Sequence, residues 1–279
     1  MTIIIKRIFL IALLALCLNA RAQYAEFYTI EVPERYVMTS LLFKDILLKD
    51  AEVMKANKVK EVLIKKDGKI TTKMLVNAEG YVEDYYTFNS ETEAIEEHWR
   101  FGYGAGNLLT SAYYRYNRER LNYILSYEND RLASIHCDSS GKESQWDFAY
   151  DDNKVSKMTL LDLQSDKAAG VYNFIYNKKG ALEKLTDEAG EGYSIKNNKN
   201  SVTIAYGNYF ANTYKFEYGR IKERTFEYQT KGELKTQTYP KKIKTSEEYF
   251  YNEKGLIAES VRKTSTGEEK SVYEYSFYE

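Results

Sequence analysis

Few side chains in this sequence belong to the types that carry out catalysis. The chain contains only two His residues, His98 and His136, and Cys137 directly follows the second. A Cys/His pair acts as a nucleophile only when the imidazole can reach and activate the thiol. Adjacent residues of a strand point to opposite faces, so we expect a buried, inert Cys137 and a surface His136. Zinc needs three or four converging ligands, and the sequence predicts neither a metal site nor a cofactor.

Other segments contain residue types that can bind phosphate or calcium. The segment 102–106 is rich in Gly, but a dinucleotide loop needs an apolar strand before it and a helix after it, and its flanks predict neither. The acidic segments 151–153 and 187–191 lack the alternating oxygen ligands of a calcium loop. With 41 Asp and Glu residues, nothing singles out the two carboxylates of a glycosidase. We therefore predict that the protein is not an enzyme.

Aromatic residues are the remaining candidates for function, since the chain has 27 Tyr and 12 Phe. If one face of a sheet stays uncovered, some of these rings can form a stacking platform for a carbohydrate or a protein partner. The residues we select for this face are Tyr113, Tyr114, Tyr123, Trp146 and Tyr172. The alternative is that a helix or a neighbouring sheet buries these rings.

The aromatic residues alternate along the chain in a way that predicts strands. Trp146, Phe148 and Tyr150 share one side of an extended segment whose other side carries Asp147 and Ala149. Three more segments repeat this alternation: 172–176, 214–218 and 273–277. A helix would scatter such residues around its axis, whereas a period of two places them on one face of a strand.

A short cassette recurs between these strands: Tyr-Asn, polar residues, usually Gly, and then an aliphatic residue. The complete copies are 176–182 and 251–257, and looser copies are 76–82, 116–121, 127–132 and 150–155. Asn177 and Asn252 can bond to their own backbone two residues on, and Gly180 and Gly255 can adopt positive φ. These four residues define hairpin turns. Their spacing leaves no room for crossover helices, so it predicts an antiparallel meander.

The N-terminal region differs from the rest of the chain. Residues 34–67 contain neither Gly nor Pro, and apolar residues recur there at helical offsets, which predicts an amphipathic helix over about 36–56. We expect this helix to cover the first edge of the sheet, with partner binding as the alternative. The predicted fold class is all-β: an antiparallel hairpin-repeat meander, as a curved or partly closed sheet, with one N-terminal α-helix.

The first 22 residues have the three-part form of a signal peptide. Lys6 and Arg7 precede an apolar run, and Ala20-Arg21-Ala22 offers a cleavage site. The run is too short to span a bilayer, so we expect no membrane span in the mature chain. The protein is therefore expected to be exported to the periplasm, the cell surface or the medium. A lipid anchor on Cys17 is the less favoured alternative, because Leu16 is larger than the residue that normally precedes a lipidated Cys.

The predicted division is a signal peptide at 1–22, an N-terminal helical cap at 23–58 and a β-hairpin repeat domain at 59–279. Cleavage removes three basic residues and leaves 37 basic and 41 acidic ones, a net charge of −4. This balance gives no basic face for nucleic acid. Only Cys137 remains after cleavage, so packing without a disulfide must hold the fold.

The cassette resembles the YD repeat of RHS-type proteins, loosely over residues 70–279. The residues that carry the resemblance are Tyr150, Asp151, Tyr176, Asn177, Gly180, Leu182, Tyr251, Asn252, Gly255 and Ile257. It implies a β-repeat scaffold outside the cytoplasm and no enzymatic activity. Long RHS arrays wind into a large hollow shell, and this chain has too few copies to close one.

Taken together, these features predict an exported, non-catalytic β-repeat protein with a binding or structural role in the cell envelope or outside the cell. One alternative is a periplasmic carrier of an apolar ligand in a half-barrel, which requires a cavity lined by Tyr214, Phe216 and Tyr218. A second is a small outer-membrane β-barrel, which requires outward-facing apolar bands. The charged residues that would interrupt such bands are Asp147, Lys215, Glu217 and Glu274.

Overall fold

The computed structural model describes residues 51–139, 141–207, 210–228 and 243–279. The predicted signal peptide, Cys17 and the part of the predicted helix before Ala51 lie outside these residues. The described chain forms one short helix, α4 (Ala51–Ala56), one 3-10 helix, η2 (Ala105–Asn107), and eighteen strands. No helix among the described residues has the length and apolar character needed to cross a membrane.

The strands are β1 (Val59–Lys66), β2 (Lys69–Val76), β3 (Val82–Phe88), β4 (Ile95–Tyr103), β5 (Leu109–Tyr116), β6 (Glu119–Glu128), β7 (Arg131–Ser139), β8 (Lys142–Asp151), β9 (Lys154–Asp162), β10 (Lys167–Tyr176), β11 (Leu182–Asp187), β12 (Gly192–Asn198), β13 (Ser201–Tyr206), β14 (Phe210–Glu217), β15 (Arg220–Tyr228), β16 (Ile243–Tyr251), β17 (Ile257–Thr264) and β18 (Gly267–Phe277).

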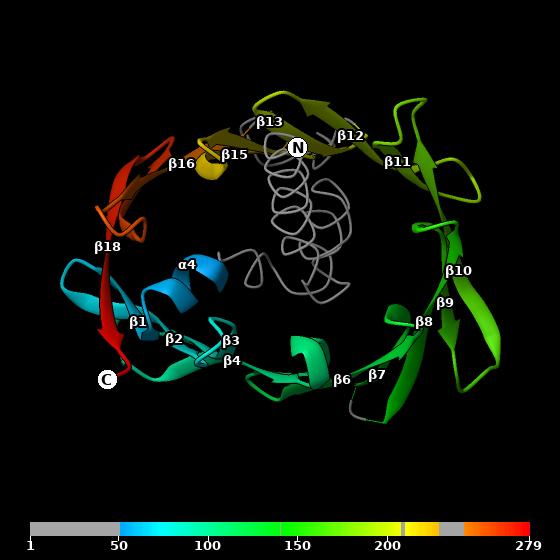
Figure 1. The fold of residues 1–279 in the computed structure, drawn as a ribbon, viewed down its shortest axis with the longest axis horizontal. Coiled ribbons are helices and arrows are strands. Elements are labelled where there is room, and N and C mark those ends of the chain that lie inside the picture. Colours follow the sequence, from blue (N-terminus) through cyan, green and yellow to red (C-terminus); the bar gives the residue numbers. More distant parts are fainter. Residues whose placement is uncertain (1–50, 140, 208–209, 229–242) are drawn as a thin grey trace, which may run out of the picture.

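All eighteen strands belong to one antiparallel sheet in which each strand pairs with the next in sequence. The first and last strands also pair, with Val62 opposite Tyr275, so the sheet closes into a barrel (Figure 1). The predicted all-β antiparallel meander is confirmed. The expectation of a curved or partly closed sheet is wrong, because β18 rather than a helix satisfies the free edge of β1. Closure leaves no edge strand whose backbone groups could pair with other chains.

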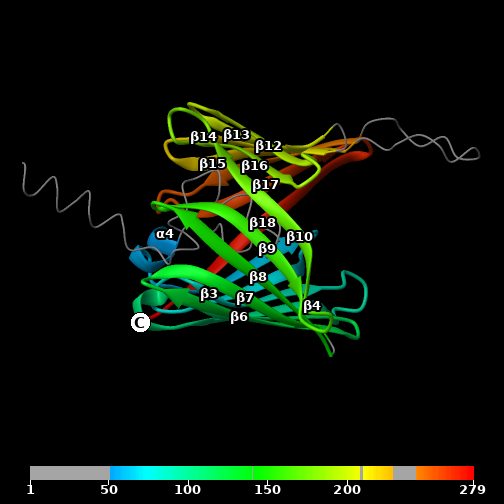
Figure 2. The same cartoon turned by 90° about the vertical axis from the view of Figure 1, so that its right-hand side faces the viewer.

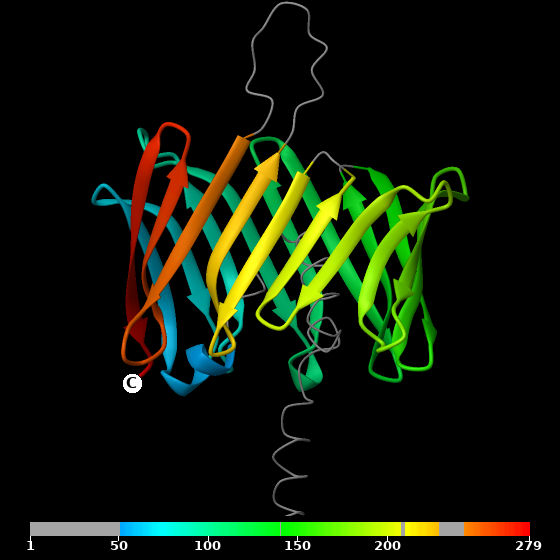
Figure 3. The same ribbon diagram turned by 90° about the horizontal axis from the view of Figure 1, so that it is seen from above.

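The two faces of the barrel wall differ in polarity. In β6, Tyr123 and Leu125 are buried, whereas their neighbours Asn122 and Ile124 are exposed. The strands are tilted against the barrel axis, as Figures 2 and 3 show, and between bulges their residues alternate between the inside and the outside. Helix α4 lies at one mouth of the barrel (Figure 3), inside the outline of the ring seen down the axis (Figure 1), and its Ala51 and Met54 belong to the buried core. The apolar face is therefore the inner face.

Electrostatic coupling between distant strands supports the same orientation. Burial raises the pKa of Tyr85 on β3 to about 12, with smaller contributions from Glu97 and from Glu247 on β16. Strands β3 and β16 are five ladder steps apart, roughly 24 Å along the wall at the usual strand spacing. Side chains so far apart along the wall influence one another only where they converge on its concave side.

Several Tyr residues at strand ends, four of which begin a copy of the cassette, have a definite structural role. The ladder between β5 and β6 ends at Ser111 opposite Ile124, and beyond this pair the carbonyl of Leu109 has no partner in the ladder. The hydroxyl of Tyr127 donates a hydrogen bond of 2.8 Å to this carbonyl. We call such a bond a tyrosine latch. It satisfies a backbone group that would otherwise be unpaired where two strands separate.

The latch recurs around the barrel, always from the end of one strand to the start of the previous one, at 2.7–3.0 Å. The bonds run from Tyr103 to Val82, Tyr127 to Leu109, Tyr150 to Leu132, Tyr176 to Val155, Tyr251 to Ile221 and Tyr275 to Ile257. In three of these sites a basic side chain lies over the latch ring, its charged group 4.9–5.5 Å from the centroid. The pairs are Arg131 with Tyr150, Lys154 with Tyr176 and Arg220 with Tyr251. The charged group adds a cation–π contact to the latch.

The predicted turn residues lie in the tight turns that follow the latches. The side-chain oxygen of Asn177 accepts hydrogen bonds from two backbone N–H groups of its own turn, at 2.9 and 3.2 Å. Asn252 accepts one at 3.0 Å in the equivalent turn. Gly180 and Gly255 have φ of +80° and +75°, a region that a side chain with a Cβ rarely adopts.

Candidate functional site

The inner wall of the barrel is the part of the described structure with the most distinctive chemistry, and two stretches of it differ in character. On β4 to β8 it is aromatic. The ring centroid of Trp99 lies 4.5 Å from that of Tyr114 and 6.2 Å from that of Tyr123, and Tyr123 in turn lies 6.4 Å from Trp146. Phe101 stacks on Trp99 at 5.9 Å. We call these five residues the aromatic wall. Offset ring pairs at such distances attract one another beyond the effect of burial alone.

The five residues predicted to form an exposed platform do not share one face. Tyr114, Tyr123, Trp146 and Tyr172 point inward, but Tyr113 lies opposite Arg100 on the outer face. The reason is the two-residue period of a strand, which sends the adjacent Tyr113 and Tyr114 to opposite sides. Tyr114 and Tyr123 are each only 8% exposed, so the barrel buries them.

On β14 to β18 the inner wall carries a network of hydrogen-bonded polar side chains instead. Glu247 is its centre: one carboxylate oxygen accepts a hydrogen bond from the hydroxyl of Ser260 at 2.8 Å, and the other accepts one from Tyr249 at 2.9 Å. Arg224 lies directly opposite Glu247 on β15. Its Nε donates to Asn212 at 3.0 Å.

The network continues from Asn212 through its amide, which donates to the buried hydroxyl of Tyr214 at 3.0 Å. On the other side, Ser260 hydrogen-bonds to Tyr273 of β18. We call Asn212, Tyr214, Arg224, Glu247, Tyr249, Ser260 and Tyr273 the polar belt. Its members come from five consecutive strands, so the belt covers a continuous stretch of the wall.

The environment keeps the tyrosines of the belt in their neutral form. Burial, followed by the negative charge of Glu247, raises the pKa of Tyr249 well above the ordinary value. Burial also raises the pKa of Tyr273 to about 12. Tyr is already protonated at neutral pH, and these shifts keep both hydroxyls as hydrogen-bond donors further into the alkaline range. The belt offers donors and one carboxylate, a combination that binds polar groups rather than one that attacks them.

The sequence analysis missed the belt, although a signal for it was present. Glu247 is in phase with Tyr249 and Tyr251, because all three are spaced by two along β16. A charged residue in the phase of the aromatic residues is expected to point into the barrel. Arg224 likewise falls in the inward phase of β15, opposite Tyr214.

The two residues considered for nucleophilic chemistry lie on opposite faces of β7. Cys137 is buried and points inward, whereas His136 faces outward opposite Ile124 and Gln145. Burial raises the pKa of the Cys137 thiol, and the hydroxyl of Tyr123 lies beside it. In the described parts of the chain no three His, Cys, Asp or Glu side chains gather as a metal site would require.

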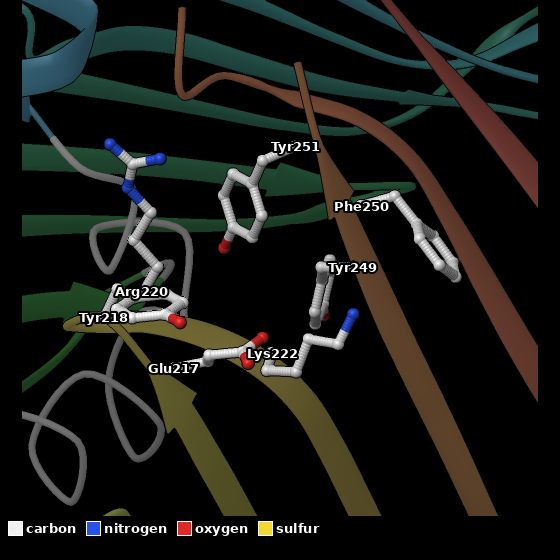
Figure 4. A pocket seen from close by; sticks show the side chains of 7 residues that line it. All are labelled: Glu217, Tyr218, Arg220, Lys222, Tyr249, Phe250 and Tyr251. Carbon is white, nitrogen blue, oxygen red and sulfur yellow. The ribbon is translucent and has the colours of Figure 1, made fainter. Parts of the chain in front are cut away.

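A pocket of about 350 Å³ opens beside β15 and β16 (Figure 4). Its lining consists of Glu217, Tyr218, Arg220, Lys222, Tyr249, Phe250 and Tyr251. The cations in it are already engaged: Arg220 lies over Tyr251, and Lys222 lies 4.9 Å from the centroid of Phe250 and forms an ion pair with Glu248. The pocket is therefore partly filled by its own cation–π pairs.

This pocket is not the cavity expected for a carrier, since only Tyr218 of the three predicted lining residues borders it. Tyr214 is buried at 1% exposure. Tyr218 does not continue the strand face of Tyr214 and Phe216, because β14 ends at Glu217 and Tyr218 follows in a turn with φ of +51°. Its side chain is 97% exposed.

Fold and site together define a closed, eighteen-stranded antiparallel barrel with an inner wall that is aromatic on one side and polar on the other. No family model matches the chain, and no curated protein matches it either. The resemblance of the cassette to the YD repeat thus stays a prediction at the level of the family.

Several solved structures are similar to the chain at low identity. A porin-like protein from Bacteroides uniformis is 11% identical, with 79% of this chain and 97% of that chain covered, at a TM-score of 0.36. A porin-like protein from Bacteroides vulgatus is 6% identical, with 79% and 98% covered, at a TM-score of 0.35. The TcdB2-TccC3 structure is 10% identical, with 72% of this chain but only 11% of that chain covered, at a TM-score of 0.25.

Proposed function

We propose that this protein is an exported, non-catalytic binding protein that holds an amphipathic ligand inside its barrel. The ligand would have an extended apolar part and a polar end that forms hydrogen bonds. The observation that supports this proposal is the division of the inner wall into an aromatic wall and a polar belt. A structure that only had to fill its interior would gain nothing from a carboxylate and an arginine there, because buried polar groups are costly unless they are paired.

The size of the barrel favours an occupant. Barrels of about eight strands are filled by their own side chains, whereas barrels of about 16–18 strands leave a channel between the inner residues. Eighteen strands therefore enclose more space than one layer of inner side chains fills. The aromatic wall suits an acyl chain or another apolar body, and the belt suits a hydroxyl, phosphate or amide at its end.

The outer face argues against the outer-membrane alternative, although that alternative also requires a closed barrel. On one part of the wall, formed by β14, β15, β17, β18, β1 and β2, charged residues on outward positions pair across the strands: Glu61 with Lys73, Lys65 with Glu274, Lys215 with Glu223, and Glu259 with Lys270. A Lys or Arg at the lipid-facing midplane of a membrane barrel costs about 2–4 kcal/mol. The outer wall thus suits water better than lipid.

Intrinsic fluorescence tests the proposal directly, because both Trp residues of the chain, Trp99 and Trp146, belong to the aromatic wall. Residues 23–279 are purified and titrated with lysophosphatidylglycerol below its critical micelle concentration. We expect a saturable change in Trp emission. Glu247→Gln is expected to weaken binding by about tenfold, which corresponds to about 1.4 kcal/mol, a typical contribution of a hydrogen bond to a charged group.

The matched control is Glu248→Gln. Glu248 is the same residue type one position along the same strand, but it faces outward and pairs with Lys222. This variant should bind as the wild type does. Absence of any saturable Trp response, or an equal effect of both substitutions, would contradict a ligand site on the inner wall.

A further inference from the structure

The hairpin formed by β5 and β6 places two like charges side by side on the outer face. Arg115 and Arg120 lie directly opposite each other in the ladder, and both are exposed. Arg118 is exposed in the turn of the same hairpin. Within the described part of the chain, no carboxylate forms an ion pair with any of these three arginines.

A like-charge pair elsewhere on the outer face is compensated within the molecule. Glu223 of β15 lies opposite Glu248 of β16, but Glu223 forms an ion pair with Lys215 and Glu248 forms one with Lys222. Like charges directly opposite in a ladder are destabilising. Because no carboxylate of the described chain offsets the repulsion between Arg115 and Arg120, the pair points to a role in binding a partner.

The presence of Arg rather than Lys restricts the chemical class of the partner. Residues 115–120 contain three Arg and no Lys, although the chain uses mostly Lys elsewhere. The guanidinium group binds carboxylate, sulfate or phosphate through two parallel hydrogen bonds, which Lys cannot do. The hairpin is therefore suited to oxyanions presented at a defined spacing.

The arginines continue a row that crosses four strands. Tyr86 of β3 lies opposite His98 of β4, and His98 lies opposite Arg115. The His98 ring stacks on Tyr86 with centroids 4.4 Å apart, and its Nε2 hydrogen-bonds to Asp84 at 2.7 Å. Asp84 also accepts a hydrogen bond from Arg100 at 2.9 Å. The carboxylate of Asp84 is therefore already engaged by His98 and Arg100.

We propose that the row of Tyr86, His98, Arg115 and Arg120 binds a linear polysaccharide that carries carboxylate or sulfate groups. A chain laid across the strands meets the four side chains in turn. The closed barrel offers no edge to which an acidic peptide could add as a strand. A flat anionic membrane at the neighbouring rim would meet the exposed Glu91 and Glu93 of the next hairpin and be repelled.

Isothermal titration of residues 23–279 with three probes tests this surface: a heparin hexasaccharide, an oligogalacturonate and neutral dextran. We expect the two anionic probes to bind and dextran not to bind. The variant Arg115→Ala/Arg120→Ala should lose at least tenfold in affinity. Arg115→Lys/Arg120→Lys should lie between it and the wild type, because charge is kept but the bidentate geometry is lost.

The matched control is Lys178→Ala/Lys179→Ala, which removes two exposed charges from the turn between β10 and β11 and should leave affinity unchanged. The arginine variant should also melt at the same or a higher temperature than the wild type, since the like-charge pair is gone, so lost binding cannot be ascribed to unfolding. The proposal would be overturned if the Arg115→Ala/Arg120→Ala variant bound the anionic probes as tightly as the wild type. It would also be overturned if the wild type bound phosphatidylglycerol vesicles or polyglutamate but not the oligosaccharides, or if it bound none of the probes. None of these outcomes depends on the ligand of the inner wall.

Discussion

Removal of single hydroxyl groups from the tyrosine latches tests the reasoning that links the repeated cassette to the barrel. Tyr127→Phe and Tyr275→Phe each delete one hydrogen bond to a strand-end carbonyl, at 2.8 and 2.7 Å respectively. The ring and its packing remain. Tyr116→Phe is the control, because Tyr116 also begins a copy of the cassette but is 43% exposed, and its hydroxyl makes no hydrogen bond within the described part of the chain.

The expected cost follows from the state in which each substitution leaves the carbonyl. A half-buried acceptor that loses its donor forfeits about 1 kcal/mol of the free energy of unfolding, more than an exposed one that water can satisfy. The two latches lie on β6 and β18, on different parts of the ring (Figure 1), and share no partner. Their costs should therefore add, to about 2 kcal/mol in the double variant. Tyr116→Phe should change stability by less than about 0.5 kcal/mol.

Urea titration followed by circular dichroism measures these differences, and thermal melting checks them. For a chain of this size about 1 kcal/mol corresponds to roughly 2–4 °C in Tm. If Tyr116→Phe destabilises as much as the latch variants, the hydroxyl–carbonyl bonds do not explain the recurring Tyr. A neutral double variant would show that the separated strand ends hold together without the latches.

Three further predictions concern stability and reactivity. The ordinary pKa of Tyr is 10.0, and burial raises the pKa of Tyr85 and of Tyr273 to about 12, so these residues ionise first in the unfolded state. The free energy of unfolding should therefore be constant below pH 10 and fall between pH 10 and 12. Urea midpoints measured over this range should fall less steeply for Tyr85→Phe/Tyr273→Phe. Gly180→Val should lower the free energy of unfolding by about 1–3 kcal/mol, because φ is +80° and a Cβ would lie 2.7 Å from Lys154 Nζ. Gly180→Asn should lower it less in the same melting assay, since Asn tolerates positive φ. Cys137 should react with Ellman's reagent only in urea, because the thiol is buried and its pKa is raised; rapid labelling of the native protein would contradict this.

The local parts of this fold could be predicted from the sequence because their causes are local. The two-residue alternation of Trp146, Phe148 and Tyr150 depends only on the geometry of one strand. The turns at Asn177 and Gly180 depend on side-chain hydrogen bonding and on φ within five residues. Both features can be read from a short window of sequence, and the structure has strands and turns at these places.

Closure could not be predicted in the same way. It depends on β1 and β18, which lie at opposite ends of the described chain, and nothing in Val62 or Tyr275 specifies the other. The number of hairpins and the twist of each pair decide whether the ends of a sheet meet, and both are summed over the whole sheet. The sequence showed the repeat but not the accumulated curvature.

The polar belt and the arginine pair could be predicted in part, because some of their causes are local and others depend on closure. The phase of Glu247 relative to Tyr249 is visible in the sequence, but the conclusion that this phase points inward requires the closed barrel. The pairing of Arg115 with Arg120 is more accessible, since a two-residue turn at Asn117 and Arg118 fixes the register of the hairpin. The Arg115–Arg120 pair could have been found by deriving the cross-strand pairs from the position of the turn. The net charge of the chain does not show it.

The seam between β11 and β12, for which no latch is seen among the described residues, shows what the latch contributes elsewhere. Between β11 and β12 only three residue pairs form, from Lys184 with Ser194 to Thr186 with Gly192. By the register of the other seams, the latch position that faces Leu182 is occupied by Asn197, whose side chain is too short to take the place of a Tyr. Leu182 itself is buried at 1% exposure. This seam therefore relies on its three ladder pairs and on the packing of Leu182, whereas the seams with a latch Tyr add a directed hydrogen bond. The latch is thus not needed to bring two strands together; it adds a hydrogen bond to a backbone carbonyl where their ends separate.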